Sequence, residues 1–136
     1  MPAELEAVAK VERPTRETRS RRVLVVDDNP VNLRVAASLV EKAGFISMPA
    51  TSGAQALEVM HSGSDVALVL MDCHMPEMDG FEATERIRAL PCGLLLPIVA
   101  LTASATPDDV AACRRAGMNE VLAKPIRLDL NYGPIM

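Results

Sequence analysis

Short apolar runs alternate with capped amphipathic stretches along this chain, and this alternation restricts its fold more than any other feature. Five runs have the length and composition of buried strands, at residues 23–26, 45–50, 66–71, 98–101 and 121–123. Strands that alternate with helices build a parallel sheet with right-handed crossovers. The third run is apolar throughout, which is typical of a strand covered on both faces. The pattern therefore predicts an α/β fold with a five-stranded parallel sheet and helices on both faces.

Start and stop signals for helices lie between these runs. Asn29 can cap a helix that has Pro30 at its first position and Gly44 beyond its end. Ser52 and Gln55 form a capping box that opens a helix to about residue 61. Residues 81–89 have the spacing of a further helix. The capping sequence at 106–109 predicts a last helix that ends at Gly117.

Composition narrows the possible functions. The 136 residues include 14 Lys and Arg against 18 Asp and Glu, which predicts one acidic domain that favours cations over nucleic acid. An aromatic content of 2% leaves few rings for base stacking. No stretch indicates a signal peptide or a membrane span, so we expect no membrane contact by this segment. Cys73, Cys92 and Cys113 form no even disulfide framework and no CxxC pair, which predicts a reducing, cytoplasmic location.

Polar residues occur where the predicted strands end. They are Asp27 and Asp28 after the first strand, Asp72 after the third, Thr102 after the fourth and Lys124 after the fifth. The carboxyl ends of parallel strands meet at one edge of the sheet, so these side chains should converge. Two carboxylates at ~4 Å repel by roughly 4 kcal/mol at an effective dielectric constant of about 20. Either one of them is protonated, or a divalent cation is bound; oxygen ligands favour Mg²⁺, for which Mn²⁺ can substitute.

A metal, a lysine and a hydroxyl around one further carboxylate are suited to phosphoryl transfer, in which positioning and charge neutralisation do most of the catalysis. Asp72 would be the nucleophile and would form an acyl phosphate. Asp27 and Asp28 would hold the metal. Lys124 and Thr102 would each bind one phosphoryl oxygen.

Four motifs of the chain resemble the receiver (CheY-like) domain of two-component response regulators, most closely the receivers of hybrid sensor histidine kinases. The motifs are VLVVDDNPVN, LVLMDCHMPEMDGFEATERIR, PIVALTA and VLAKP, and the resemblance covers about residues 22–128. It implies a flavodoxin-like, doubly wound sheet in the order 2-1-3-4-5. We accordingly predict a flexible tail or interdomain linker over 1–20, the receiver domain over 21–128 and an atypical C-terminal tail over 129–136.

The resemblance also implies a reaction, partners and ligands. A phosphohistidine on a histidine kinase or a histidine phosphotransfer domain would donate its phosphoryl group to Asp72. Asp28 and Asp72 would ligate Mg²⁺ directly, Asp27 would act largely through water, and the backbone carbonyl of His74 would complete the protein ligands. Catalysis would be limited to phosphorylation and autodephosphorylation of Asp72 itself.

Two positions depart from the family pattern. Many receivers carry an aromatic residue three places before the lysine, where this chain has Val121, so we expect only a small response there on phosphorylation. After Pro125 the chain ends in IRLDLNYGPIM, in which Gly133 and Pro134 would break a helix. The C-terminal helix is therefore expected to be short or missing, and self-association through the incomplete face is a hypothesis.

Two other functions stay open at this point. A phosphorylation-independent interaction module would need none of the five residues. A small-molecule aspartyl-phosphate phosphohydrolase usually carries its nucleophile in a DxD motif after the first strand, where this chain has Asp27, Asp28 and Asn29. Cys73 adjoins Asp72, but no partner cysteine for it is evident in the sequence.

Overall fold

The computed structural model describes residues 21–124 of the chain. Its elements are, in chain order, β1 (Arg22–Val26), α2 (Pro30–Lys42), β2 (Ile46–Ala50), α3 (Gly53–His61), β3 (Val66–Asp72), α4 (Gly80–Arg88), the 3₁₀ helix η2 (Pro91–Gly93), β4 (Ile98–Thr102), α5 (Pro107–Ala116) and β5 (Glu120–Ala123). The predictions for the tail over 1–20, for the C-terminal tail and for a short or missing last helix lie outside the described residues.

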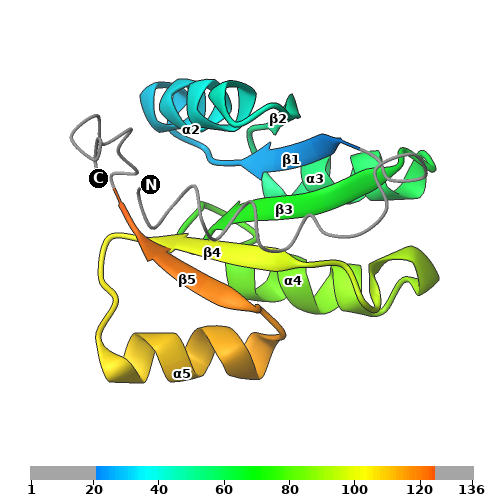
Figure 1. Ribbon diagram of the computed structural model, residues 1–136. Coiled ribbons are helices and arrows are strands. Elements are labelled where there is room, and N and C mark those ends of the chain that lie inside the picture. The colour runs from blue at the N-terminus through cyan, green and yellow to red at the C-terminus, as the bar shows by residue number, and fades with distance from the viewer. Residues whose placement is uncertain (1–20, 125–136) are drawn as a thin grey trace.

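All five strands are parallel and lie in the order β2-β1-β3-β4-β5 (Figure 1), as the sequence analysis predicted. The registers align the strand ends. Val26 pairs with Ala50 and Met71, Asp72 pairs with Leu101, and the last residue of β4 pairs with the last residue of β5. The loops that leave β1, β3, β4 and β5 therefore start at the same edge of the sheet.

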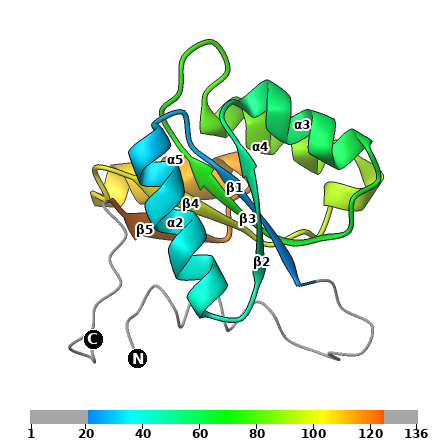
Figure 2. The same ribbon diagram turned by 90° about the horizontal axis from the view of Figure 1, so that it is seen from above.

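Two apolar layers hold the helices on opposite faces of the sheet. Val23 and Val25 face α2, where they pack with its residue Leu39. Leu24 and Val26 face α3, α4 and α5, through a larger cluster that includes Ile87 of α4 and Cys113 of α5. Figure 2 shows α2 on one side of the strands and α3 on the other. This alternation of one strand's side chains between two helix layers is the reason that β1 is apolar throughout.

Local signals in the sequence explain most element ends. The Asn29 side chain accepts the backbone N–H groups of Val31 and Asn32 at the start of α2. Gly117 ends α5 with φ 107°, a left-handed conformation that costs glycine little. The Ser52 hydroxyl caps α3 as predicted, whereas the Gln55 side chain accepts the N–H of Thr51 at 2.8 Å, one residue before the cap.

The structure shifts some predicted boundaries. Phe45 precedes β2 because its N–H donates to the Val40 carbonyl at the end of α2. Asp72 and Thr102 are themselves the last residues of β3 and β4. The short 3₁₀ helix before β4 was not predicted.

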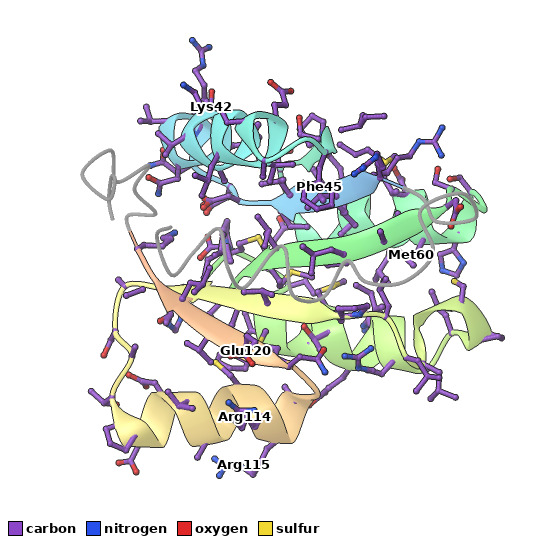
Figure 3. The ribbon with its side chains drawn as sticks, viewed as in Figure 1. Lys42, Phe45, Met60, Arg114, Arg115 and Glu120 are labelled. Atoms are coloured by element: carbon purple, nitrogen blue, oxygen red, sulfur yellow. The ribbon has the colours of Figure 1, made fainter. Side chains whose placement is uncertain are left out.

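Polar side chains such as Lys42 on α2 and Arg115 on α5 lie on the outer surfaces (Figure 3). Within residues 21–124, every helix is too short or too polar to cross a membrane.

Candidate active site

The five polar residues predicted from the strand ends lie at one edge of the sheet, which the arrowheads in Figure 1 mark. Asp27, Asp28 and Asp72 each offer a carboxylate oxygen, and these three oxygens lie within 4.8 Å of one another. Asp27 and Asp72 are buried, and Asp28 is exposed. The cluster therefore opens to solvent on the side of Asp28.

Lys124 joins two of the carboxylates. Its Nζ lies 3.1 Å from Asp72 Oδ1 and 3.3 Å from Asp27 Oδ2. The Lys124 side chain is 17% exposed, against 1% and 3% for the side chains of Asp27 and Asp72. Its backbone N–H donates to the Thr102 carbonyl at 2.7 Å, which fixes the start of the side chain beside β4. The second oxygen of Asp27 accepts the N–H of Asn29 at 2.9 Å.

Burial and neighbouring charge control protonation here. Burial raises the pKa of Asp72 above its ordinary value, and the negative charge of Asp27 adds to the rise, although the hydrogen bond from Lys124 lowers it. For Lys124, burial lowers the pKa, but the hydrogen bonds and charges of Asp72 and Asp27 together outweigh this and raise it. The ammonium form of Lys124 is thus favoured, and the Asp72 carboxylate requires positive charge nearby.

The donor set fits a hard divalent cation. All three converging ligand atoms are carboxylate oxygens, and one of the three residues is exposed, so water could complete a coordination shell. His and Cys side chains, which softer metals prefer, are not among them. Asp27, Asp28 and Asp72 could therefore hold Mg²⁺, while Lys124 contacts one oxygen of Asp27 and one oxygen of Asp72.

The loop after β3 fixes the position of Asp72. The Gly80 N–H donates to the Cys73 carbonyl at 2.9 Å, and Asp79 caps α4 by accepting the N–H of Glu82. A Cβ on residue 80 would collide with the Asp72 carbonyl oxygen and would lie 2.9 Å from Cys73 Cα. Glycine is therefore needed where α4 begins beside the candidate nucleophile.

His74 lies in the same loop with its side chain exposed. Its backbone N–H points to Asp72 Oδ1 at 3.4 Å, and its ring meets the Phe81 ring edge-on, with 6.2 Å between the centroids. The role of its backbone carbonyl as a metal ligand stays a prediction.

Thr102 is buried at the end of β4, but its hydroxyl is engaged with the following loop. The hydroxyl donates to the Ser104 carbonyl at 2.8 Å and accepts the Ser104 N–H at 3.2 Å. Ser104 was not identified from the sequence. Its position two residues after a strand-ending threonine was the available signal, because such hydroxyls commonly bond to nearby backbone groups.

Two thiols meet next to Asp72, a contact that was not evident from the sequence. The Sγ atoms of Cys73 and Cys113 lie 3.7 Å apart, within reach of a weak hydrogen bond, and both residues are buried and form no disulfide. Burial raises the pKa of the Cys73 thiol, and the charge interaction and hydrogen bond with Cys113 raise this pKa further. A raised pKa reduces the reactive thiolate form, so this pair is a packing contact of low reactivity.

Comparison with known proteins places this geometry in a family. The sequence model of the response regulator receiver domain matches residues 23–130. The chain is 36% identical to the sensor histidine kinase RcsC of Escherichia coli K12 over 124 residues, which are 91% of this chain and 13% of RcsC. It is 42% identical over 115 residues to GacS of Pseudomonas protegens, covering 82% of this chain and 12% of GacS. The chain thus spans only a small part of these relatives.

Solved structures agree with the sequence relatives. The receiver domain of sensor histidine kinase PA1611 from Pseudomonas aeruginosa PAO1, which has a magnesium ion in its active site cleft, is 39% identical with a TM-score of 0.71, covering 79% of this chain and 88% of that domain. The complex of the Saccharomyces cerevisiae phosphotransfer protein Ypd1 with the receiver domain of Ssk1 gives 28% identity and a TM-score of 0.70, covering 81% and 82%. With its sheet order, its strand-end residues and these matches, the chain belongs to the response regulator receiver domain family.

Proposed function

We propose that this domain accepts a phosphoryl group on Asp72 in a two-component phosphorelay and changes conformation as the signal. The convergence of the Asp27, Asp28 and Asp72 oxygens, with Lys124 Nζ at 3.1 Å from Asp72 Oδ1, carries this proposal. Lys124 is close enough to pair with a phosphoryl oxygen when Asp72 becomes an acyl phosphate. The phosphoryl group would stabilise a conformer that differs in its affinity for a partner.

The reaction exchanges one bond to phosphorus for another. An Asp72 carboxylate oxygen attacks the phosphorus of a phosphohistidine, the P–N bond breaks, a P–O bond forms, and the departing imidazole nitrogen takes up a proton. In autodephosphorylation, water attacks the phosphorus and releases inorganic phosphate, which restores the carboxylate. Lys124 neutralises charge in both steps, and Thr102 donates its hydroxyl to another phosphoryl oxygen once it has left Ser104.

Asp28 and Asp72 would bind Mg²⁺ directly, with Asp27 acting through water and the His74 carbonyl as a further ligand. Mg²⁺ bound there would offset the negative charge of the carboxylates and of the incoming phosphoryl oxygens. Mn²⁺ prefers the same oxygen ligands and is proposed as a substitute.

The test is incubation of the 136-residue chain with acetyl phosphate and Mg²⁺, followed by intact-mass measurement. We expect a mass gain of one phosphoryl group that is labile to hydroxylamine, absent in Asp72→Asn and retained in Asp108→Asn, which removes a carboxylate outside the site. Turnover of phosphate esters would instead indicate a small-molecule phosphohydrolase. A wild-type chain that gains no phosphoryl group and does not bind beryllofluoride would indicate a phosphorylation-independent interaction module.

For the donor, we propose a phosphohistidine on a histidine kinase or phosphotransfer domain that docks on α2. This helix starts beside the site, directly after Asn29, and carries two exposed apolar residues one turn apart, Val31 at 69% and Val35 at 41% exposure. Apolar surface next to a reactive group is suited to a protein donor.

Replacing both valines should slow phosphoryl transfer from a phosphorylated histidine phosphotransfer domain about tenfold. Val31→Ser/Val35→Ser is the test variant, and its labelling by acetyl phosphate should match that of the wild type. Leu95→Ser is the control, because Leu95 is 91% exposed and lies before β4, at the opposite edge of the sheet. Equal transfer rates in all three proteins would contradict docking on α2.

We also propose a cytoplasmic location for this segment. Its three cysteines are free, and two of them lie 3.7 Å apart without a disulfide, which suits a reducing compartment. Alkylation of the thiols during cell lysis under denaturing conditions, which expose the buried Cys73 and Cys113, should label all three; an oxidised pair would count against this location.

A further inference from the structure

A chain of hydroxyl groups connects the Thr102 side chain to helix α5. Thr102 Oγ1 exchanges two hydrogen bonds with the backbone of Ser104. The Ser104 hydroxyl in turn donates to Asp109 Oδ2 at 2.6 Å, and the Thr106 hydroxyl donates to the same oxygen at 2.9 Å. The Asp109 carboxylate on α5 therefore binds two residues of the β4–α5 loop, and one of them, Ser104, binds Thr102.

This arrangement competes with the reaction. A hydroxyl has a single hydrogen, so Thr102 cannot donate to the Ser104 carbonyl and to a phosphoryl oxygen at the same time. Thr102 must leave Ser104 before it can assist at Asp72. Any group that holds Ser104 in place thus stabilises the conformer in which the Thr102 hydroxyl is bonded to Ser104 and cannot bind a phosphoryl group at Asp72.

We propose that Asp109 is a positioning residue that latches the β4–α5 loop and so sets the fraction of molecules ready to bind the phosphoryl group. This inference rests on the proposed function of Asp72. Helix α5 is a fixed attachment point, because Cys113 and Ala116 are buried and Cys113 belongs to the apolar cluster on that face of the sheet. The loop itself is exposed from residue 103 to residue 106, so the Asp109 carboxylate is its main side-chain link to a packed element.

The neighbouring residue offers a matched control. Asp108 also lies in the first turn of α5, where either carboxylate interacts favourably with the helix dipole. Both carboxylates should therefore stabilise the helix start through their charge. Only Asp109 makes the bonds to Ser104 and Thr106.

The experiment titrates the 136-residue chain with beryllofluoride at saturating Mg²⁺ and follows binding by the amide NMR signals of residues 102 and 104. Because apparent affinity scales with the fraction of the competent conformer, Asp109→Ala should bind about three- to tenfold more tightly than wild type. Ser104→Ala breaks the same link from the loop side and should shift the affinity in the same direction. Asp108→Ala should match wild type.

A second comparison separates the latch from helix capping. Asp109 also belongs to the N-cap of α5, because its N–H donates to the Thr106 hydroxyl. Loss of capping lowers the unfolding temperature but leaves beryllofluoride affinity unchanged. Ser104→Ala keeps the Thr106 cap, so its affinity change reports the latch alone. In the double variant Ser104→Ala/Asp109→Ala, the two affinity changes should be clearly less than additive, because each substitution removes the same Ser104–Asp109 hydrogen bond.

The outcomes distinguish this proposal from the one it rests on. If wild type fails to bind beryllofluoride and takes no phosphoryl group, the proposed function of Asp72 fails. If wild type binds and the Asp109→Ala and Asp108→Ala variants have equal affinities, the latch is overturned while the function stands. A weaker affinity in Asp109→Ala would also overturn the latch.

Discussion

At the scale of single residues, the site depends on a close approach that only glycine permits. The Gly80 N–H binds the Cys73 carbonyl, and α4 begins there against the end of β3. An added methyl group would overlap the Asp72 carbonyl, so either α4 or the end of β3 would have to move. Gly80 therefore serves both packing and the placement of the nucleophile.

We predict that Gly80→Ala lowers the free energy of unfolding by roughly 1–3 kcal/mol, as for other overpacked positions, and also greatly reduces phosphorylation of Asp72 by acetyl phosphate. The control is Gly63→Ala. Gly63 has φ 82° and open space around its Cβ position, so alanine there strains the backbone without touching the site. Chemical denaturation and intact-mass measurement would check both effects. Full phosphorylation of the Gly80→Ala protein would contradict the argument.

Asp109 supplies a second prediction at this scale. Hydrogen bonds from Ser104 and then Thr106 lower the pKa of Asp109 below its ordinary value of 3.8. The unfolded chain then binds a proton more readily than the folded one as the solution becomes acidic. The contribution of Asp109 to stability should be complete well above pH 3.8 and should disappear as the pH falls through its folded pKa.

The difference in unfolding free energy between wild type and Asp109→Asn should accordingly be present at neutral pH and shrink below about pH 4. Urea denaturation over this pH range measures it. A difference that stays constant into acid would mean that the Asp109 charge makes no contribution through these hydroxyl groups.

At the scale of elements, the sequence predicted all five strands and the four α-helices described here. Each strand came from a short, mostly apolar run, three helices came from capping signals, and the helix near residues 81–89 came from its helical spacing. The convergence of Asp27, Asp28, Asp72, Thr102 and Lys124 was also predictable, because parallel strands end at one edge. Their assignment to phosphoryl transfer depended on the family motifs in addition to this placement.

Contacts across the fold were not predictable. Cys73 and Cys113 are 40 residues apart, and their meeting depends on how α5 packs into the apolar cluster that also contains Cys73. The link from Ser104 to Asp109 depends on the path of a loop that has no apolar pattern. The Gln55 bond to Thr51 in place of Ser52 reflects a backbone detail that a capping motif does not specify.

Strand β5 gives a prediction at the element scale. Val121 pairs with Ala100 and is partly buried against the apolar layer of α3, α4 and α5. A β-branched side chain has a restricted χ1 and no ring to rotate. Beryllofluoride should therefore change the methyl NMR signals of Val121 much less than the amide signals of residues 102 and 104. In Val121→Tyr the ring signals should shift strongly, and a large rearrangement of Val121 in the wild type would refute the prediction.

At the scale of the whole molecule, the sheet edge that holds the site carries an excess of negative charge. Three aspartates converge beside the single ammonium group of Lys124, so the charges of these four site residues sum to −2. The 136-residue chain as a whole is acidic, with a net charge of −4, so distant residues add to the attraction of cations. A divalent cation at this edge would relieve repulsion that the fold otherwise has to withstand.

We therefore predict that Mg²⁺ stabilises the folded chain. A ligand that binds only the native state adds about 1.4 kcal/mol at ten times its Kd, which should raise the unfolding temperature by several degrees for a domain of this size. Na⁺ at the same ionic strength screens charge without occupying the cluster and should raise it much less. Asp28→Asn removes one exposed ligand and should shift the Mg²⁺ dependence to higher concentration, whereas Asp108→Asn should leave it unchanged. Calorimetry of the three proteins tests this, and identical Mg²⁺ responses in all of them would place the stabilising ion elsewhere.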